Sequence, residues 1–580
     1  MVPQYIIMLS ILLGICCAQA TQYTRVNIDN GPIKGIVQYV DGRAIRIFKG
    51  IPFAEPPVGN LRWKAPVPYT QKWNKPLNAT VYKPRCPQYV APGTTPDPRG
   101  ISEDCLYTNV WAPVPEYDGE TFPVMVWIHG GAFISGSPED FGVGNFSILA
   151  VTKRIIIVAA SYRINAFGFF SSSLLGKSQP EARGVYGLLD QRLGLKWVKN
   201  NIAAFSGKSR DITIYGQSAG GISVCLQAVT PLNDSPSGKL FSRVIGSSGY
   251  CDILPPTNNS ADAQLAQQLG CTTKECLYSI PWQNITAAVG PGFLSFQPTV
   301  GGNNFLPEQP ISLLAKRTNP RGKHFVPDIY MQGFTANEGT FVLYNYFPQT
   351  YDNPNTPGFP TQQIADYISI SSGNYSAEYY YNNLAPLYST EYNPNVTYPG
   401  QGFMSQVDDI MACNTRRNMI YWQQSKKTQA HSWYFDSAPS TLVYPPWTKV
   451  FHESDVFYVA RRCDGLWCTN LTCEQDNLGK NMDIYWNSAI RTGSLTPKNS
   501  PDDLRDVPEW PQFGKKEIVM HFTAEGENKG PLSPIPFSSI IADDGNYQYL
   551  RRCQTLDKIR ARYYNIPALD PETYLNSCPV

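Results

Sequence analysis

The sequence predicts an α/β protein with a central, mostly parallel sheet flanked by helices. Two short apolar segments, residues 124–128 and 155–160, have the composition of strands that are buried on both faces. Residues 187–205 carry apolar side chains four and seven positions apart, which is typical of an amphipathic helix. A β-rich segment follows at residues 211–215 and leads into a second predicted helix at residues 221–229. Strand, helix and strand in this order indicate α/β architecture.

The composition indicates a folded and nearly neutral protein. The chain has 580 residues, of which 42% are hydrophobic and 16% are charged, and its formal net charge is +2. This apolar content is too high for a disordered chain. No basic patch or charge run stands out in the sequence, so we expect no nucleic acid as a partner. A chain of this length can bury a large core.

Residues 1–20 predict a cleaved signal peptide. The apolar segment at residues 5–17 is too short to span a bilayer, and residues 18–20 (AQA) form an A-x-A cleavage site. No Lys or Arg precedes the apolar segment, so a retained anchor and a buried segment are the alternatives. No later segment is long and apolar enough to span a membrane, and the C-terminus carries no hydrophobic tail. We therefore expect a secreted, extracellular protein without an integral membrane anchor.

Cysteines and sequons agree with export. Fourteen cysteines are present, and the 12 that follow the predicted signal peptide form an even number, as expected for disulfides in an oxidising compartment. Cys463, Cys468 and Cys473 lack the spacing of metal ligands and have no accompanying histidine, so we expect no metal site. Eight N-x-S/T sequons are candidate glycosylation sites: Asn78, Asn145, Asn233, Asn258, Asn284, Asn374, Asn395 and Asn470.

Residues 216–220 (GQSAG) form a G-x-S-x-G motif between a predicted strand and a predicted helix. A sharp strand-to-helix turn holds the central Ser218 in a strained backbone conformation, and the glycines let the turn close. The hydroxyl then lies at a helix N-terminus, where backbone N–H groups and the helix dipole favour developing negative charge. We interpret Ser218 as a nucleophile, and the alternative is an incidental turn.

A serine hydroxyl needs a base to become a good nucleophile, and the chain offers five histidines. His129 precedes two glycines, where a backbone role is favoured. His324, His431 and His521 lie in strand-like segments, where packed histidines are common. His452 opens a polar turn after an apolar segment. By elimination we favour His452 as the base, and the alternative is a histidine in a surface loop.

An acid and a set of oxyanion donors complete the predicted site. In hydrolases with the G-x-S-x-G motif, the acid lies between the serine and the histidine in chain order. Glu338 lies in a tight polar turn at residues 335–339 and is our choice, with an exposed turn glutamate as the alternative. Gly130 and Gly131 follow the first apolar strand and can present two N–H groups at one point. The N–H of Ala219, next to the nucleophile, is the third donor.

Further segments across the mature chain carry a specific resemblance. They are residues 48–59 (FKGIPFAEPPVG), 103–107 (EDCLY), 129–131 (HGG), 162–169 (YRINAFGF), 190–192 (DQR), 216–220 (GQSAG), 305–307 (FLP), 337–339 (NEG), His452 with 454–455 (SD), 485–486 (YW) and 491–493 (RTG). Together they resemble the carboxylesterase type B family, which includes cholinesterases, carboxylesterases, some fungal lipases and the non-enzymatic neuroligins. The resemblance implies an α/β-hydrolase fold with a gorge at the C-terminal edge of the sheet. It also implies one catalytic domain over residues 21–580 and a Ser218/Glu338/His452 triad, with Ser248 hydrogen-bonded near the triad acid.

The same resemblance implies three disulfides. They join Cys86 to Cys105, Cys271 to Cys276 and Cys413 to Cys553. Cys225, on the helix after Ser218, is expected to be buried rather than bridged. The cysteines without an assigned partner are Cys251, Cys463, Cys468, Cys473 and Cys578.

Two departures from the family pattern narrow the substrate. Gln217 stands where cholinesterases carry a carboxylate beside the nucleophile, and the loop from Cys86 to Cys105 contains no Trp to stack on choline. That loop is also short and proline-rich, which argues against the apolar lid of a lipase. The resemblance therefore implies a serine esterase that hydrolyses small, neutral carboxylic esters through an acyl-serine, with no cofactor. A secreted lipase and a neuroligin-like recognition module are the alternatives, and the intact triad argues against the second.

Overall fold

One mixed sheet of 13 strands organises the part of the chain that this computed structural model describes. The described residues are 22–40, 42–90, 97–140, 147–176, 180–252, 254–290, 296–346, 399–439, 448–460, 471–495, 507–524, 532–540 and 552–558. The strands are β1 (Gln22–Ile28), β2 (Gly31–Val40), β3 (Arg43–Pro52), β4 (Leu77–Asn78), β5 (Tyr107–Pro113), β6 (Phe122–Ile128), β7 (Ile156–Ala160), β8 (Gly207–Gln217), β9 (Arg243–Ser247), β10 (Ile329–Thr335), β11 (Gln429–Phe435), β12 (Ile518–Phe522) and β13 (Leu532–Pro536).

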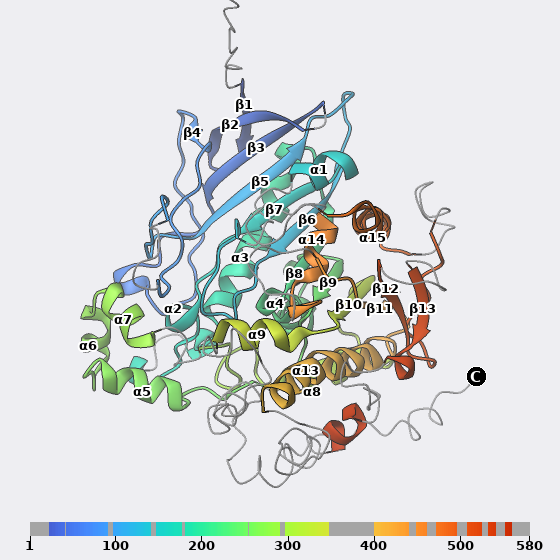
Figure 1. Ribbon diagram of the computed structural model, residues 1–580. Helices are drawn as coiled ribbons and strands as arrows, with labels where there is room; N and C mark the ends of the chain where they lie inside the picture. Colours follow the sequence, from blue (N-terminus) through green and yellow to red (C-terminus); the bar gives the residue numbers. More distant parts are fainter. Residues whose placement is uncertain are drawn as a thin grey trace, which may run out of the picture.

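The centre of the sheet is parallel and its two ends are antiparallel. The neighbours follow the order β1-β2-β3-β5-β7-β6-β8-β9-β10-β11-β12-β13, with β4 beside β2. The strands from β7 to β12 in this order pair in parallel, whereas β1, β2, β3, β5 and β13 pair antiparallel with their neighbours in the order. The short strand β4 pairs with β2 in parallel. Figure 1 shows the blue N-terminal strands and the red C-terminal strands at opposite ends of the sheet. The predicted strands at residues 124–128, 155–160 and 211–215 are β6, β7 and β8, so this part of the prediction is confirmed.

Helices cover the sheet. They are α1 (Ser147–Lys153), α2 (Asn165–Phe169), α3 (Tyr186–Asn201), α4 (Ala219–Val229), α5 (Ser260–Gln268), α6 (Lys274–Ser279), α7 (Trp282–Val289), α8 (Pro310–Thr318), α9 (Glu338–Tyr346), α13 (Pro399–Trp422), α14 (Ser454–Ala460) and α15 (Cys473–Thr492). The helix predicted at residues 187–205 is α3, and its last part is a separate 3₁₀ turn, Ile202–Phe205. The helix predicted at residues 221–229 is α4, which begins two residues earlier. None of the helices in the described ranges is both long and apolar enough to cross a membrane.

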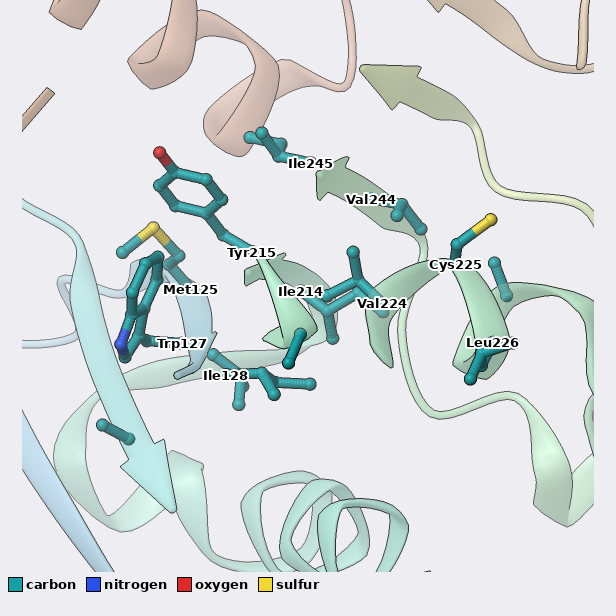
Figure 2. Close-up of a cluster of buried hydrophobic side chains, with 14 of the residues drawn as sticks. Met125, Trp127, Ile128, Ile214, Tyr215, Val224, Cys225, Leu226, Val244 and Ile245 are labelled. Atoms are coloured by element: carbon teal, nitrogen blue, oxygen red, sulfur yellow. The ribbon is translucent and has the colours of Figure 1, made fainter. Parts of the chain in front are cut away.

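The second half of β8 is buried on both faces of the sheet. Figure 2 shows Ile214 of β8 pointing toward Val224 of α4, while Tyr215 points to the opposite face of the sheet. There Tyr215 packs edge to face on Trp127, with the ring centroids 5.0 Å apart. Ile214 and Tyr215 are almost fully buried. Burial on both faces fixes β8 in the sheet, and with it the position of the turn that leads into α4.

The parallel strands bring the predicted site residues to one edge of the sheet. In an open α/β sheet, ligands bind outside the carboxyl ends of the strands. β8 ends at Gln217, which pairs with Ser247 at the end of β9, and Ser247 in turn pairs with Gly333 in β10. Ile128, the last residue of β6, pairs with Gly216 on the other side of β8. The turns that follow these four strands therefore leave the sheet side by side.

Candidate active site

Ser218 lies in the strand-to-helix turn that the sequence predicts. It is the single residue between β8 and α4, and its backbone has φ 58° and ψ −125°. A Cβ on Gly216 would lie 2.3 Å from the carbonyl oxygen of Gly220, and one on Gly220 would lie 2.0 Å from that of Ile128, so both positions need glycine. The Ser218 N–H donates to the carbonyl oxygen of Ser247 at 2.9 Å. The turn is thus held in a strained conformation that leaves the serine side chain partly exposed.

Glu338 is buried at the start of α9, close to the end of β10. Its Oε1 accepts a hydrogen bond from the Ser248 hydroxyl at 2.7 Å and another from the Thr335 N–H at 2.7 Å. Its Oε2 pairs with Nδ1 of His452. The contact of Ser248 with the acid is the one that the family resemblance implies. Glu338 is therefore not the exposed turn glutamate of the alternative interpretation.

His452 is buried in the turn before α14, and its ring is oriented by Glu338. Burial disfavours the charged imidazolium, but the Glu338 carboxylate outweighs this effect, so the pKa of His452 lies above its ordinary value. Asn337, which lies in the turn between β10 and α9, forms an isolated β-bridge with Phe451, the residue before His452. This bridge holds the two segments together although 114 positions separate the acid from the base.

Gln217 contacts the same imidazole from the other side. Its side chain is buried, and its Nε2 lies 3.0 Å from Nε2 of His452. With Nδ1 bound to the Glu338 carboxylate, Nε2 is the acceptor in the neutral ring, and the glutamine amide is the donor. Among the described side chains, no hydrogen bond joins the Ser218 hydroxyl to His452. The sequence motif predicts that Gln217 is next to the nucleophile but not that it reaches the base.

The predicted oxyanion donors also lie at this edge. A Cβ on Gly130 would lie 3.0 Å from Cβ of Ser218 and 2.9 Å from the carbonyl oxygen of Gln217, so the glycine turn after β6 packs directly against Ser218. Gly131 has φ 102°, a conformation that favours glycine. Ala219 is the first residue of α4, and its N–H has no acceptor inside the helix. The structure thus brings all three predicted donors to the surroundings of Ser218.

The other four histidines, all among the described residues, do not contact Glu338, and burial lowers the pKa of two of them, His129 and His431. His129 bonds through Nδ1 to the carbonyl of the next residue, and burial lowers its pKa to about 4. His431 is buried in β11, where burial lowers its pKa to about 4, and His521 lies in β12. His324 is not in a strand, as its neighbouring residues predict, but in an exposed loop that follows α8, where it pairs with Asp234. Elimination on sequence grounds therefore selects the histidine that the structure places against Glu338.

Three further buried carboxyl groups lie near the pair, and only Asp455 of them is named in the sequence analysis, in the segment 454–455 that follows His452. Burial raises the pKa of Glu453 to about 8 and that of Asp455 to about 6. Glu453 also has φ 88°, which is unusual for a residue with a side chain. Asp408 of α13 accepts from the Gly339 N–H at 2.8 Å, and burial raises its pKa. The proximity of Glu453 and Asp455 to His452 in the sequence is a signal for their position, whereas nothing local indicates Asp408.

Four disulfides are present in the described residues. Three are those that the family resemblance implies: Cys86–Cys105, Cys271–Cys276 and Cys413–Cys553. The fourth joins Cys225 to Cys251, so the expectation that Cys225 is buried but unbridged is wrong. The reason is that α4 packs against β9, which brings Cys225 next to the segment that follows β9. Cys463, Cys468 and Cys578 lie outside the described residues.

The sequons divide by exposure. Asn78, Asn258 and Asn284 are exposed, as a glycan requires. Asn233 is buried, and its side-chain amide donates to the carbonyl of Gln227 at 2.6 Å while its oxygen accepts from Arg192 at 2.9 Å. A glycan on this nitrogen would break the contacts that fold the segment, so Asn233 does not suit glycosylation. The remaining candidates, Asn145, Asn374, Asn395 and Asn470, lie outside the described residues.

Comparison with known proteins agrees with this geometry. The family model described as the carboxylesterase family matches residues 22–533. A "probable cholinesterase" of Acanthamoeba polyphaga mimivirus is 85% identical over 578 residues, which cover 100% of both chains.

Animal proteins of the same kind are more distant. An acetylcholinesterase of Bungarus fasciatus is 30% identical over 531 residues, which cover 84% of this chain and 81% of the snake protein. A cholinesterase of Mus musculus is 31% identical over 478 residues, which cover 75% and 73% of the two chains. This chain therefore belongs to the carboxylesterase family, and it is a serine hydrolase of carboxylic esters.

Proposed function

We propose that this chain is a secreted esterase that hydrolyses neutral carboxylic esters, with Ser218 as nucleophile, His452 as base and Glu338 as the acid that orients the base. The observation that carries the proposal is the position of Ser218. It is held in a strained turn at the N-terminus of α4, at the sheet edge where His452 and Glu338 form a buried pair. A serine beside an oriented histidine–carboxylate pair is the arrangement that acyl transfer requires.

In the first half-reaction the Ser218 oxygen attacks the ester carbonyl carbon while His452 Nε2 takes the hydroxyl proton. The carbonyl oxygen gains negative charge, which the N–H groups of Gly130, Gly131 and Ala219 stabilise. The tetrahedral intermediate then collapses. The bond to the alcohol oxygen breaks, and His452 returns the proton to the leaving alcohol. The acyl group is now an ester of Ser218.

The second half-reaction repeats these steps with water. His452 takes a proton from the water molecule, whose oxygen attacks the acyl-serine carbonyl. The intermediate collapses, the proton returns to Ser218, and the carboxylic acid leaves. Glu338 keeps the proton on Nδ1 throughout and stabilises the imidazolium when it forms. The chemistry assigned to these residues needs no metal or organic cofactor.

The proposed preference for neutral esters rests on two features: residue 217 is uncharged, and the loop between Cys86 and Cys105 lacks a tryptophan ring. Gln217, the residue next to the nucleophile, carries no charge and is already bonded to His452. The loop between Cys86 and Cys105 contains no Trp, so it lacks the best aromatic face for a quaternary ammonium group. Neither Gln217 nor the Cys86–Cys105 loop therefore supplies the attraction that the cationic group of a choline ester would need.

Hydrolysis of choline esters is the second candidate. The three relatives named above are called cholinesterases or acetylcholinesterase. In addition, the Phe341 ring lies beside the base, with its centroid 5.6 Å from that of His452, and its side chain is only half-buried. An aromatic face at this distance could contact a cationic alcohol group.

Secretion and domain organisation are part of the same proposal. Four disulfides among the described residues agree with an oxidising compartment. The predicted signal peptide at residues 1–20 lies outside the described residues. One sheet contains strands from residue 22 to residue 536, which supports a single catalytic domain over residues 21–580.

The test is to label and assay the protein secreted by cells that express the full chain. A fluorophosphonate is expected to label Ser218 stoichiometrically, and Ser218→Ala should abolish both labelling and ester hydrolysis while keeping the wild-type melting temperature. A panel of aryl, short-acyl, long-acyl and choline esters then ranks the substrates. A label on another residue, or an alanine variant with wild-type turnover, would overturn the assignment of the nucleophile.

A further inference from the structure

The side chain of Gln217 fills the space between the glycine turn and the base. Its Oε1 lies 2.9 Å from the position that a Cβ on Gly130 would occupy, and its Nε2 lies 3.0 Å from Nε2 of His452. The side chain is 2% exposed, so water does not compete freely for its amide. The absence of a side chain at residue 130 is what gives the amide this place next to Ser218.

The contact with His452 involves the one atom that the base needs for catalysis. A neutral imidazole has one N–H and one acceptor lone pair. The Glu338 carboxylate takes the N–H on Nδ1, so the lone pair is on Nε2. The Gln217 amide donates into this lone pair, and the Ser218 hydroxyl needs the same lone pair to transfer its proton. The amide and the hydroxyl therefore compete for a single acceptor.

We propose that Gln217 is a positioning residue that occupies Nε2 of His452 in the free enzyme and must release it before Ser218 can transfer its proton. This inference rests on the proposed function, because it assumes that His452 is the base. The glutamine amide suits such an exchange. Its NH₂ group stabilises neutral His452, and after rotation its oxygen can accept from Nε2–H when the ring is protonated.

A carboxylate at residue 217 could not do the same. It can only accept at Nε2, so it would stabilise the protonated ring, which is inactive as a base. The titratable groups that face His452 are all carboxyl groups: Glu338 from α9, and Glu453 and Asp455 from the segment that carries His452 itself. Each of them favours the imidazolium once it is ionised, and burial delays this for Glu453, whose pKa it raises to about 8. The Gln217 amide acts in the opposite direction, because its N–H donates to the neutral form of the ring.

The inference predicts a pH effect with a definite sign. A hydrogen bond to the neutral ring lowers the pKa of a histidine, so removal of that bond raises it. The base works in its neutral form, and activity therefore rises as the pH passes through the pKa of His452. Without the Gln217 donor, the midpoint of this rise should move to higher pH. A side chain that only fills space would not shift it.

The experiment compares Gln217→Asn, Gln217→Ala and Gln217→Glu with the wild-type enzyme. The asparagine is one methylene shorter and keeps the amide group, so it tests whether the amide must reach Nε2 of His452. The measurements, from pH 5 to pH 10, are kcat/KM for 4-nitrophenyl acetate and the rate at which an uncharged sulfonyl fluoride inactivates Ser218. Gln191→Asn is the matched control, because Gln191 is also buried but donates its hydrogen bond to Ser223 of α4 and not to His452.

We expect the asparagine and alanine variants to raise the midpoint by about half a pH unit or more, and the glutamate variant to raise it further. At pH values above the midpoint, the asparagine and alanine variants should inactivate at least as fast as the wild type. The control should keep the wild-type midpoint. If either variant that folds keeps the wild-type midpoint, lowers it or inactivates more slowly at high pH, the competition does not exist.

The result separates the two proposals. If the sulfonyl fluoride does not modify Ser218 in the wild-type enzyme, the proposed function fails. If it modifies Ser218 but the Gln217 variants behave like the control, the esterase assignment stands and only the role of Gln217 is overturned. The melting temperature of each variant identifies any that fail to fold, and the three substitutions differ enough in size that one variant should remain measurable.

Discussion

The Ser248 hydroxyl donates a 2.7 Å hydrogen bond to Oε1 of Glu338, and this leaves Oε2 of the carboxylate for His452. The two oxygens therefore have different partners. Oε1 meets two donors, the Ser248 hydroxyl and the Thr335 N–H, and Oε2 meets the N–H of the imidazole. A carboxylate is the one side chain of this size that can accept on both sides, so the orientation of the base depends on its charge as well as its shape.

Glu338→Gln should lower kcat by about 10³–10⁴-fold with a much smaller effect on substrate binding. The amide oxygen will take the place of Oε1, because a donor there would face the Thr335 N–H. The NH₂ group then faces Nδ1 of His452, which forces the proton onto Nε2 and removes the acceptor that Ser218 needs. Steady-state kinetics with a neutral aryl ester gives the two effects separately.

The control for this substitution is Asp455→Asn, because Asp455 is the nearest alternative acid in the sequence. Asp455 accepts from the Ser247 hydroxyl and from Trp433 Nε1, and neither contact involves the imidazole. We expect this variant to keep most of its turnover. The opposite pattern, with large losses in the asparagine variant and small losses in the glutamine variant, would make Asp455 the functional acid.

A neutral ester should be hydrolysed at least as efficiently as a choline ester of matched acyl group and size. Gln217 lacks charge, the Cys86–Cys105 loop lacks Trp, and a lost cation–π contact of about 1.4 kcal/mol reduces specificity tenfold. The measurement is kcat/KM for the two esters side by side. A preference of about tenfold or more for the choline ester would show that other aromatic residues, such as Phe341, form a cation site.

Glu453→Gln should stabilise the protein more at high pH than at low pH. Burial raises the pKa of Glu453 to about 8, so the folded protein keeps a proton that the unfolded chain releases above about pH 4.5. Its contribution is most favourable below pH 4.5 and becomes less favourable as the pH rises to about 8. The glutamine variant cannot titrate, and its advantage in free energy of unfolding should grow across this window by up to about 4–5 kcal/mol.

Denaturant unfolding at pH 5 and at pH 8.5 measures this difference. Glu275→Gln, at an exposed position on α6, serves as the control and should show no growing advantage. An equal effect of Glu453→Gln at the two pH values would mean that the Glu453 carboxyl is charged in the folded protein at neutral pH.

Replacing both Cys225 and Cys251 by Ala should lower the free energy of unfolding by about 2–4 kcal/mol. The bond closes a loop with a sequence separation of 26, and its loss lets the unfolded chain gain conformational entropy. Replacing both Cys271 and Cys276 is the comparison, because that bond spans a separation of only 5 and should contribute about 1 kcal/mol less. Peptide mapping of the non-reduced protein that pairs Cys225 with another cysteine would contradict the assignment.

Local sequence was sufficient to predict the turn that holds Ser218, the proposed nucleophile, and the strands around it. The turn at Ser218 depends on glycines two residues away on either side, and the apolar composition of β6 and β7 depends only on burial on both faces. The proposal of His452 as the base followed from a short list of five histidines, four of which lie in segments that explain them otherwise. In each case the physical constraint acts within a few residues, so the pattern can be recognised without the fold.

The tertiary structure alone decided which distant side chains meet. The hydrogen bond between Gln217 and His452 joins residues 235 positions apart, and the Cys225–Cys251 bond depends on how α4 packs on β9. The burial of Asn233 and of Glu453 likewise depends on neighbours from other segments. The sequence by itself determined the family and the strand–turn–helix at Ser218, and it supplied the chain order of the proposed triad. Some contacts require a particular face of a helix or a particular path of a loop, and the pKa shifts require burial. Both arise only once the chain has folded, because they depend on distances of a few ångströms between segments that are far apart in the sequence.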